Sequence, residues 1–329
     1  MVTVRKSQPN NQQVHVNKPL TNISIAYMQN ETNYIADQIF PRVPVTKQSD
    51  KYFVFDKGDW FRDEAKLRGP SQESAGSGYN VSTESYFCDV WALHKDIADQ
   101  IRANEDNPLN SDRNATQFVT GRLLLSRERK FVDNYMSTGV WDHEMEGGAS
   151  GGSGDFVHWD DYDNSDPIED VEDGIEEIEG VTGFRPNVMA MGSEVWRALK
   201  NHPDILERYK YTQRGVITPD LIAPIFGIDR IHIARGVHNK AAEGLDDDFE
   251  YIHPDSVLLA YANPQPAIEM PSAGYTFTWT GYGGSNAYGV TISTFRMEKL
   301  KSDRVEGELA YDQKVVAEDL GCLLHSVTS

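Results

Sequence analysis

The sequence predicts an α+β protein, and three observations support that prediction. Helix-like and strand-like segments alternate between Asp166 and Gly236. A long stretch near residues 111–137 has the spacing of a helix, and aromatic runs before it have the composition of strands. With 329 residues, the chain has ample length to bury a large core in one or two domains.

The segment that begins at Asp166 is predicted to be an amphipathic helix. Asp166 followed by Pro167 is typical of a helix start, because aspartate caps free N–H groups and proline fits the first turn. Gly180 and Gly183 are expected to end it. Apolar residues recur between these ends every three or four positions, which places them on one face of an otherwise acidic helix: Ile168, Val171, Ile175 and Ile178.

A strand, two short helices and further strands are predicted next. Residues 188–191 are wholly apolar, as a buried strand is. A helix that starts at Ser193 should stop at Pro203, because proline cannot continue the hydrogen-bond ladder. Another helix begins at Pro219, and Pro224 limits it to about one turn. Strands are then expected at residues 228–233, 256–262, 275–279 and 288–295.

Residues 51–93 are predicted to form a long β-hairpin. Residues 52–55 and 86–91 are aromatic and β-branched, as half-buried strands are. Residues 63–79 between them are charged and then rich in glycine and serine, so they cannot form a core. A hairpin of this length buries too little apolar surface to stand alone, so we expect it to rest on another structure. The alternative is a flexible surface excursion.

The longest helix is predicted from Ser111 to about Ser137, roughly 40 Å at about 1.5 Å per residue. Its second half is basic, with Arg122, Arg127, Arg129 and Lys130. A solvated face would explain this cluster, and cations also suit the C-terminal end of a helix dipole. We favour a third interpretation, in which these residues pair with acidic residues of a neighbouring copy of the chain.

Two segments have the composition of flexible chain. Residues 1–45 are rich in asparagine and glutamine and only sparsely apolar, and prolines that include Pro19, Pro41 and Pro44 prevent a single helix. Such a segment does not order by itself, so it is either a disordered tail or an arm that lies on another surface.

Residues 147–154, with the sequence GGASGGSG, are predicted to be a mobile, exposed linker.

The distribution of charge argues against ordinary nucleic-acid binding. The net charge is −20, and no Lys or Arg lies between Lys130 and Arg185, whereas 16 Asp and Glu residues do. The first 30 residues contain no acidic residue, only Arg5, Lys6 and Lys18. Sequence-independent binding to nucleic acid needs a positive footprint, and most of this molecule has the opposite sign.

Neither membrane insertion nor a disulfide scaffold is expected. The longest apolar run, about residues 257–262, is far shorter than the roughly 20 residues of a membrane-spanning helix. Residues 1–30 lack the apolar core of a secretion signal. Cys88 and Cys322 fit a reducing cytoplasm better than an oxidised scaffold, although a single bridge between them stays open.

No motif for catalysis or for a cofactor is complete. The glycine-rich linker lacks the Lys-Ser/Thr end of a phosphate loop, and no Gly-x-Gly-x-x-Gly opens a helix after a strand. Ser285 lies in a sequence close to a nucleophile elbow, but no helix is expected to follow it. We therefore expect no catalytic residue and no cofactor.

One acidic stretch matches part of a calcium-loop register: Asp161, Asp163, Ser165 and Glu172. Asp166, however, stands where the sharp turn of that loop requires glycine, and a helix start explains Asp166 better. The nine histidines are scattered, without the spacing of a transition-metal site. No dedicated metal site is expected, and loose binding of divalent ions by the acidic stretch is the alternative.

Four segments occur in an order that resembles a known family. They are residues 186–203, which begin PNVMAMG and end at HP, then residues 218–236, 273–279 (AGYTFTW) and 314–323 (KVVAEDLGCL). In this order they are similar to the major capsid proteins of tailed bacteriophages, which share the Hong Kong 97-type fold. The resemblance covers most of the chain.

The resemblance implies the domain organisation of that capsid fold. Its expected parts are an N-terminal arm (1–45), an extended hairpin loop (46–95), a peripheral domain (96–185) with a spine helix at about 111–137, an axial domain (186–275) and return strands of the peripheral domain (276–329). In the family, the matching hairpin loop lies across the adjacent subunit, and the resemblance favours an arm that also lies on neighbours.

The resemblance also implies a structural protein rather than an enzyme. Copies of it would assemble through hexamers and pentamers into an icosahedral virion shell around double-stranded DNA, which would be enclosed without specific binding. A portal protein, and a scaffold or decoration protein, are further expected partners; synthesis in the host cytoplasm and no membrane contact are expected. The candidate inter-subunit contacts are aromatic and basic residues of the hairpin loop and spine helix: Trp60, Phe61, Arg62, Arg68, Arg122, Arg127, Arg129 and Lys130.

Two other functions stay open at this point. A cellular nanocompartment shell that encloses enzymes has the same fold, although a polar, proline-containing arm fits the viral version better. An enzyme that acts on glycans through paired carboxylates is suggested by the 51 acidic residues, 6 Trp and 15 Tyr. Those acids, however, concentrate in one predicted helix and linker, as on a solvated face.

Overall fold

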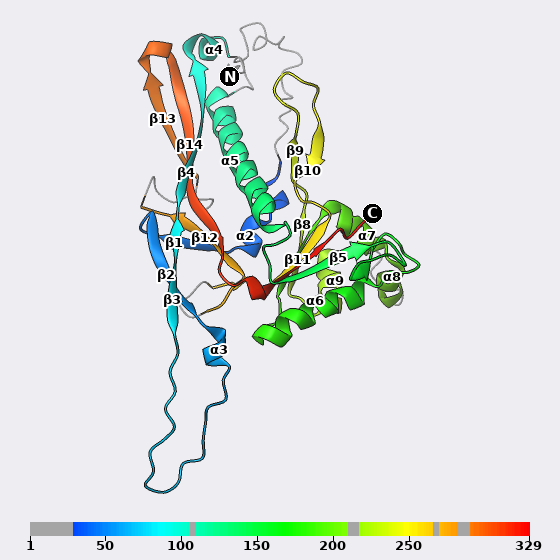
Figure 1. The fold of residues 1–329 in the computed structure, drawn as a ribbon. Helices are drawn as coiled ribbons and strands as arrows, with labels where there is room; N and C mark the ends of the chain where they lie inside the picture. Colours follow the sequence, from blue (N-terminus) through cyan, green and yellow to red (C-terminus); the bar gives the residue numbers. More distant parts are fainter. Residues whose placement is uncertain (1–28, 106–109, 210–216, 266–269, 282–289) are drawn as a thin grey trace.

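The structure is a computed structural model that describes residues 29–105, 110–209, 217–265, 270–281 and 290–329. Residues 1–28, which make up most of the predicted arm, and Ser285 lie outside the described residues. The molecule is elongated, with a helix-flanked sheet on one side, a long sheet and helix on the other, and a loop that extends far beyond both (Figure 1). It is α+β, as predicted, with helices and strands segregated into different layers.

A six-stranded sheet forms the centre of the largest hydrophobic core. Its strand order is β6 (Phe156–Val157), β5 (His143–Gly148), β15 (Gly321–His325), β11 (Ser256–Ala260), β7 (Val188–Gly192) and β8 (Arg230–Ala234). Every residue of β7 and β11 is buried, because strands in the middle of a covered sheet have no solvent face. These two strands are the apolar runs that the sequence predicted.

Four helices pack beside this sheet: α6 (Pro167–Thr182), α7 (Ser193–Asn201), α8 (Pro203–Tyr209) and α9 (Pro219–Phe226). Asp166 caps α6 by accepting from the N–H groups of the next turn, and Gly183 ends it with a φ of 71°. Gly180, by contrast, lies inside the helix. The prediction of about one turn for α9 was too short, since α9 has eight residues with Pro224 inside it.

The longest helix, α5 (Ser111–Tyr135), lies along a five-stranded sheet. The strand order is β1 (Arg42–Val45), β12 (Gly274–Trp279), β14 (Ser302–Val315) and β13 (Val290–Met297), and β4 (Asp89–Ala98) also pairs with β14. Gly307 of β14 lets the helix approach closely, because a Cβ there would lie 2.5 Å from Val119 Cγ1. Val119, Leu123 and Leu309 form the core of this contact.

The predicted hairpin is present, but its second strand differs from the prediction. β2 (Ser49–Phe55) pairs with β3 (Val81–Phe87), so the partner strand begins five residues before the predicted Tyr86. The chain then continues past the buried Cys88 into β4, which pairs with β14 in the other sheet. A single aromatic run therefore serves two sheets, which composition alone does not reveal. A short helix, α3 (Lys57–Trp60), follows β2.

The glycine-rich run at 147–154 is not simply a linker. Gly147 and Gly148 belong to β5 and pair with Phe156 and Val157, and only residues 149–155 form a turn. A Cβ on Gly147 would lie 2.1 Å from the carbonyl oxygen of Ser326, so glycine is needed there for close backbone approach.

The remaining elements are small. Two of them are short helices, α2 (Ala36–Ile39) and α4 (Asp99–Ala103). Three are 3-10 turns: η2 (Glu31–Asn33), η3 (Glu298–Leu300) and η4 (Glu318–Leu320). The last is a two-stranded ribbon of β9 (Val237–Asn239) and β10 (Phe249–Tyr251). Cys88 and Cys322 are both buried and free. None of the helices in the described ranges is both long enough and apolar enough to cross a membrane.

Candidate inter-subunit surfaces

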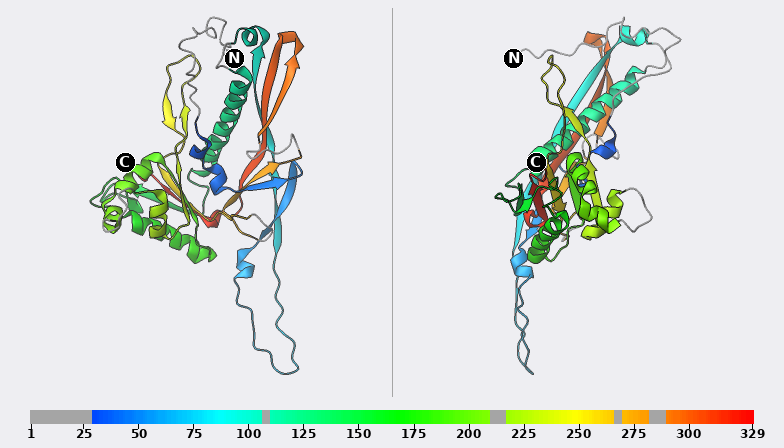
Figure 2. Two further views of the ribbon diagram at one scale, coloured as in Figure 1. Left: turned by 180° about the vertical axis from the view of Figure 1, so that it is seen from behind. Right: turned by 90° about the vertical axis from the view of Figure 1, so that its right-hand side faces the viewer.

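The loop of the β2–β3 hairpin, residues 56–80, projects away from the body of the molecule. It is extended both in the view of Figure 1 and in the two rotated views of Figure 2. Its neck is fixed by Asp59, whose carboxylate accepts from the backbone and the side-chain amide of Asn80, at 2.9 and 3.0 Å. Asp56 caps α3 beside it by accepting from the N–H of Gly58. Nearly every residue from 61 to 80 is exposed.

Exposed aromatic side chains gather at this neck. Phe55, Trp60 and Tyr79 form a cluster with ring centroids 5.6 to 6.1 Å apart, and Phe61 follows directly. Trp60 is 57% exposed and Phe61 is 61% exposed, and Leu67 farther along the loop is fully exposed. Single exposed apolar residues are normal, but a group of large ones on a projecting element is typical of a surface that another protein covers.

The predicted basic residues of the loop lie at different places along it. Arg62 is close to the neck, with Nη1 3.6 Å from the carboxylate of Asp59. Arg68 lies farther out and donates from Nε to the carbonyl oxygen of Gln72. The structure therefore brings Trp60, Phe61 and Arg62 together and leaves Arg68 apart from them.

Three of the predicted residues on α5 are accessible to solvent. Arg122 lies over the ring of Phe118, 5.0 Å from its centroid. Arg129 lies 3.7 Å from Asp133 one turn later on the exposed side of the helix. Lys130 lies over the ring of Trp91 in β4, and partial burial lowers its pKa.

Arg127 does not fit the expected role as a contact with a neighbouring copy. Its side chain is only 7% exposed and forms an ion pair with Asp37 of the same chain, which also pairs with Arg42. Burial lowers the pKa of Arg127, and the Asp37 carboxylate opposes that effect. The helical spacing of the basic residues could not predict this ion pair, because Asp37 lies 90 positions away in the sequence.

Glu128, which the sequence analysis did not single out, is the most buried charged residue of α5. Its carboxylate accepts from the backbone N–H groups of Ile35 and Ala36, at 2.8 and 3.0 Å, and contacts Nε2 of His253 at 2.8 Å. Glu128 is 1% exposed. One signal was available: it lies four residues after Leu124 and three before Phe131, so it falls within the apolar face of the helix.

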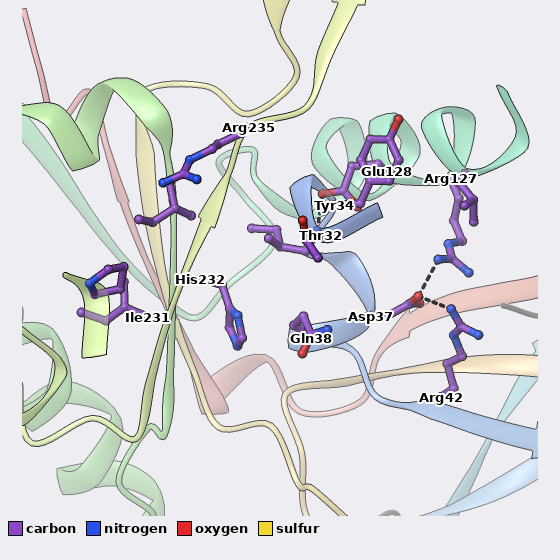
Figure 3. Close-up of a pocket in the computed structure, with 14 residues that line it drawn as sticks. Thr32, Tyr34, Asp37, Gln38, Arg42, Arg127, Glu128, Ile231, His232 and Arg235 are labelled. Atoms are coloured by element: carbon purple, nitrogen blue, oxygen red, sulfur yellow. Dashed lines mark hydrogen bonds and ion pairs between the residues drawn. The ribbon is translucent and has the colours of Figure 1, made fainter. Parts of the chain in front are cut away.

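These groups line a cleft of about 750 Å³ between α2, α5 and β8 (Figure 3). Asp37 lies between the guanidinium groups of Arg127 and Arg42, while His232 and Arg235 of the β8 segment lie across the cleft from them. The charged groups mostly neutralise one another within the chain. The arrangement therefore fastens residues 29–42 to the spine helix and to the six-stranded sheet.

One buried arrangement resembles a catalytic triad but lacks its chemistry. Nε2 of His202 lies 3.1 Å from the Ser165 hydroxyl, and Nδ1 lies 3.4 Å from Asp204. The backbone N–H of Asp204 donates to Nδ1, which favours the tautomer with the ring proton on Nε2, where it is donated to Ser165. The hydroxyl of Ser165 in turn donates to the carbonyl oxygen of Asp161, at 2.7 Å. In this tautomer His202 is a donor to Ser165 rather than its base, and the network joins the chain before α6 to the start of α8.

The acidic residues of α6 form a solvated face, as its periodicity predicted. Ile168, Val171, Ile175 and Ile178 are buried, and the carboxylates of the helix are exposed apart from the half-buried Asp170. Gly174 lets the helix lie close to the sheet, since a Cβ there would be 3.0 Å from Leu259 Cδ1. Within the described ranges, no three His, Cys, Asp or Glu side chains are placed to hold a metal ion together.

Comparison with known proteins finds phage capsid proteins. A family model described as phage major capsid protein E matches residues 157–250. The major capsid protein of Burkholderia phage BcepMu is 27% identical over 276 residues, covering 81% of this chain and 84% of that protein. The major capsid protein of Pseudomonas phage JBD67 is 26% identical over 316 residues, covering 93% of this chain and 95% of that one.

The chain is similar in sequence to phage major capsid proteins over most of its length. Solved structures show the same fold. A phage-related protein from Bordetella bronchiseptica superposes with a TM-score of 0.68 at 22% identity, over 92% of this chain and 94% of that one. The capsid of cyanophage P-SCSP1u gives 0.60 at 11% identity, over 98% and 96%. The Synechococcus elongatus encapsulin gives 0.56 at 12% identity, over 94% and 94%.

The chain therefore has the Hong Kong 97-type fold and a structural role in the shell of the virion. The aromatic neck of the hairpin loop and the exposed side of α5 are its candidate contacts with other copies. The buried groups of the cleft, in contrast, hold one subunit together.

Proposed function

We propose that copies of this chain assemble through hexamers and pentamers into an icosahedral shell that encloses the double-stranded DNA genome of a phage. The observation that supports this proposal most directly is the hairpin loop. It exposes Trp60, Phe61 and Leu67 on an element with no core of its own. Such a loop is stabilised only when its apolar surface is covered, and a closed shell supplies a neighbouring copy at every position.

The contact surfaces are proposed at two places. The loop, with Trp60, Phe61, Arg62 and Arg68, lies across an adjacent subunit, and Arg122, Arg129 and Lys130 of α5 meet acidic groups of another copy. Arg127 is left out because Asp37 already pairs with it. Within each subunit, residues 96–185 and 276–329 act as a peripheral domain and residues 186–275 as an axial domain.

The chain acts by assembly, without an enzymatic role. The net charge of −20 favours an interior that encloses DNA without holding it, so that packaged DNA can move during filling. A portal protein, and a scaffold or decoration protein, are the further proposed partners, with synthesis in the host cytoplasm. A nanocompartment shell is the second candidate, because an encapsulin shares the fold.

The loop supplies the test. We expect replacement of residues 63–78 by a short Gly-Ser linker to leave the subunit soluble and its thermal unfolding unchanged, because the neck formed by Asp59 and Asn80 is kept. The variant should nevertheless form no closed particles by electron microscopy and sedimentation. A variant with a Gly-Ser loop of the original length is the matched control. It keeps the length of the loop but removes its side chains, so it shows which of the two the assembly requires.

Normal particles from the shortened variant would contradict the assignment of the loop to an inter-subunit contact. The contents of particles from the parent chain separate the two candidate functions. Nuclease-protected double-stranded DNA supports the virion shell, whereas a protein cargo without genome supports the nanocompartment.

A further inference from the structure

The ribbon formed by β9 and β10 has an open edge beside the point where the described chain begins. Bonds from Lys240 N to Asp248 O (2.8 Å) and from Ile252 N to Gly236 O (2.9 Å) show which main-chain groups of β9 face β10. Bonding alternates along an antiparallel pair, so the N–H and C=O groups of Val237 and Asn239 face the other way. Among the described residues, the ribbon therefore presents one strand edge without a partner strand.

Gln29 occupies the first position on that edge. Its side-chain amide accepts from the N–H of Val237 at 2.8 Å and donates to the carbonyl oxygen of the same residue. Farther toward the base, Arg235 N donates to Asn33 O at 3.2 Å. Residues 29–33 thus run antiparallel to the chain at 235–237. The main-chain groups of Asn239, next along the edge, have no hydrogen-bond partner within the described part of the chain.

One face of the ribbon is also uncovered. Phe249 is 66% exposed and Tyr251 is 44% exposed, and they share a face with Val237; Leu245 at the tip is 70% exposed. The opposite face carries His238 paired with Glu250 at 3.2 Å. Burial lowers the pKa of His238, and the charge of Arg129 on α5 lowers it further. A two-stranded ribbon with a bare aromatic face is marginal in water without a third strand.

The chain immediately before Gln29 has the pattern of that third strand. Ile23, Ile25 and Tyr27 alternate with Asn22, Ser24 and Ala26, the period of a strand with one apolar face. The charges are complementary as well. Residues 1–30 carry only basic charges, whereas the ribbon tip carries Glu243, Asp246, Asp247 and Asp248 against a single Lys240.

We propose that residues 22–28 dock on the free edge of β9 in the same chain, as a third antiparallel strand with Tyr27 opposite Asn239. Residues 22–28 can meet β9 of the same chain without a connecting segment, because they directly precede Gln29, which already contacts Val237. In this register Ile25 and Tyr27 lie on the face of Phe249 and Tyr251. The basic residues upstream then pass the acidic tip, and only residues 1–21 are left to reach a neighbouring subunit.

Two disulfide pairs test the register. The main-chain N–H of Lys240 points toward the β10 side of the ribbon, away from the free edge. Ala26 and Lys240 would therefore lie opposite each other as a non-hydrogen-bonded pair, with Cα atoms about 4.5 Å apart. That spacing suits a disulfide, so Ala26→Cys with Lys240→Cys should form an intrachain bond under mild oxidation. Tyr27→Cys with Lys240→Cys is the matched control, whose side chains lie on opposite faces. Cys88 and Cys322 are buried and do not compete.

Hydrogen exchange on the full-length chain provides the second measurement. Ile25→Asp with Tyr27→Asp should speed exchange at the Asn239 amide about tenfold or more, because that N–H loses its partner. Val14→Asp with Val16→Asp makes the same charge change upstream and should leave this amide unchanged. Both measurements use unassembled subunits, so the result does not depend on shell formation.

The proposal is overturned if the Ala26–Lys240 cysteine pair links two chains rather than one, or reacts no faster than the control pair. It is also overturned if the Asn239 amide exchanges equally fast in the parent chain and in the Ile25→Asp, Tyr27→Asp variant. Protection that appears only in assembled particles would assign the strand to a neighbouring copy and would likewise exclude docking within the chain.

Discussion

At the scale of single residues, the acidic helix α6 contains a carboxylate with a displaced pKa. Asp170 is turned toward Trp159, whose indole Nε1 donates to Oδ2 at 2.8 Å. Burial raises the pKa of Asp170 to about 7, the hydrogen bond from Trp159 lowers it in part, and neighbouring acids raise it. The folded state therefore keeps a proton at pH values where an unfolded aspartate, with a pKa of about 3.9, has lost it.

This difference predicts how stability changes with pH. The contribution of the protonated Asp170 to the free energy of unfolding is fully present below about pH 4. It is lost as the pH rises through about 7, because the unfolded chain binds fewer protons than the folded chain in that window. Asp170→Asn keeps an acceptor for Trp159 and removes the charge. We expect the variant to be more stable by about 2 kcal/mol at pH 8, discounted for partial exposure, and unchanged near pH 4.

Thermal unfolding of unassembled subunits from pH 4 to 8 measures the effect. Glu176→Gln, at an exposed position farther along the same helix, is the matched control and should not change the slope. A parallel pH dependence for the Asp170→Asn variant and the parent would show that this carboxyl titrates normally.

At the scale of elements, Glu128 connects three segments that are distant in the sequence. It caps the start of α2 through Ile35 and Ala36 and pairs with His253 before β11. Its replacement by alanine would leave two backbone N–H groups and a buried imidazole without their partner. Such losses are costly because the groups cannot reach water.

We therefore predict that Glu128→Ala lowers the free energy of unfolding by about 3–5 kcal/mol and exposes residues 29–42 to proteolysis. Asp133→Ala, on the exposed side of the same helix, should cost less than about 0.5 kcal/mol. Urea unfolding and limited proteolysis measure both effects. If the two variants prove equally stable, the buried carboxylate does not fasten the arm to α5.

Elements with a strong local pattern were predicted correctly, and those that depend on distant partners were not. Helix α6 carries its own cap, apolar period and terminal glycine, so it was readable from the chain alone. β14, the longest of the described strands, has charged and polar residues at many positions, and their pattern did not predict a strand there. It is a strand because β4, β12 and β13 all pair with it. The β9–β10 ribbon was missed for the same reason.

At the scale of the whole molecule, charge is distributed so that identical copies repel. The exposed carboxylates of α6 have few basic neighbours; Arg185 pairs with Glu179 at 3.3 Å. If these faces meet in the shell, added salt or divalent ions should screen the repulsion and raise the temperature at which particles dissociate. The Debye length falls from about 10 Å at 0.1 M salt to about 3 Å at 1 M, so the gain should come within that range.

Light scattering of particles heated at several salt concentrations measures this dependence. Replacement of Glu172, Glu176 and Glu179 by glutamine should reduce it, because the same volume is kept without charge. If the dissociation temperature of the shell changes with neither salt nor magnesium, these carboxylates are simply hydrated and face no other copy.

The sequence by itself determined the α+β class, the positions of α5, α6, α7, β7 and β11, and the hairpin with its exposed loop. These follow from periodicity, capping and composition, which are properties of neighbouring residues. The order of four segments gave the resemblance to phage major capsid proteins. Only the tertiary structure decided that Arg127 and Glu128 are internal, that one aromatic run serves two sheets, and that one edge of β9 has no partner strand among the described residues. Burial and strand pairing depend on residues far away in the chain, and no local pattern contains that information.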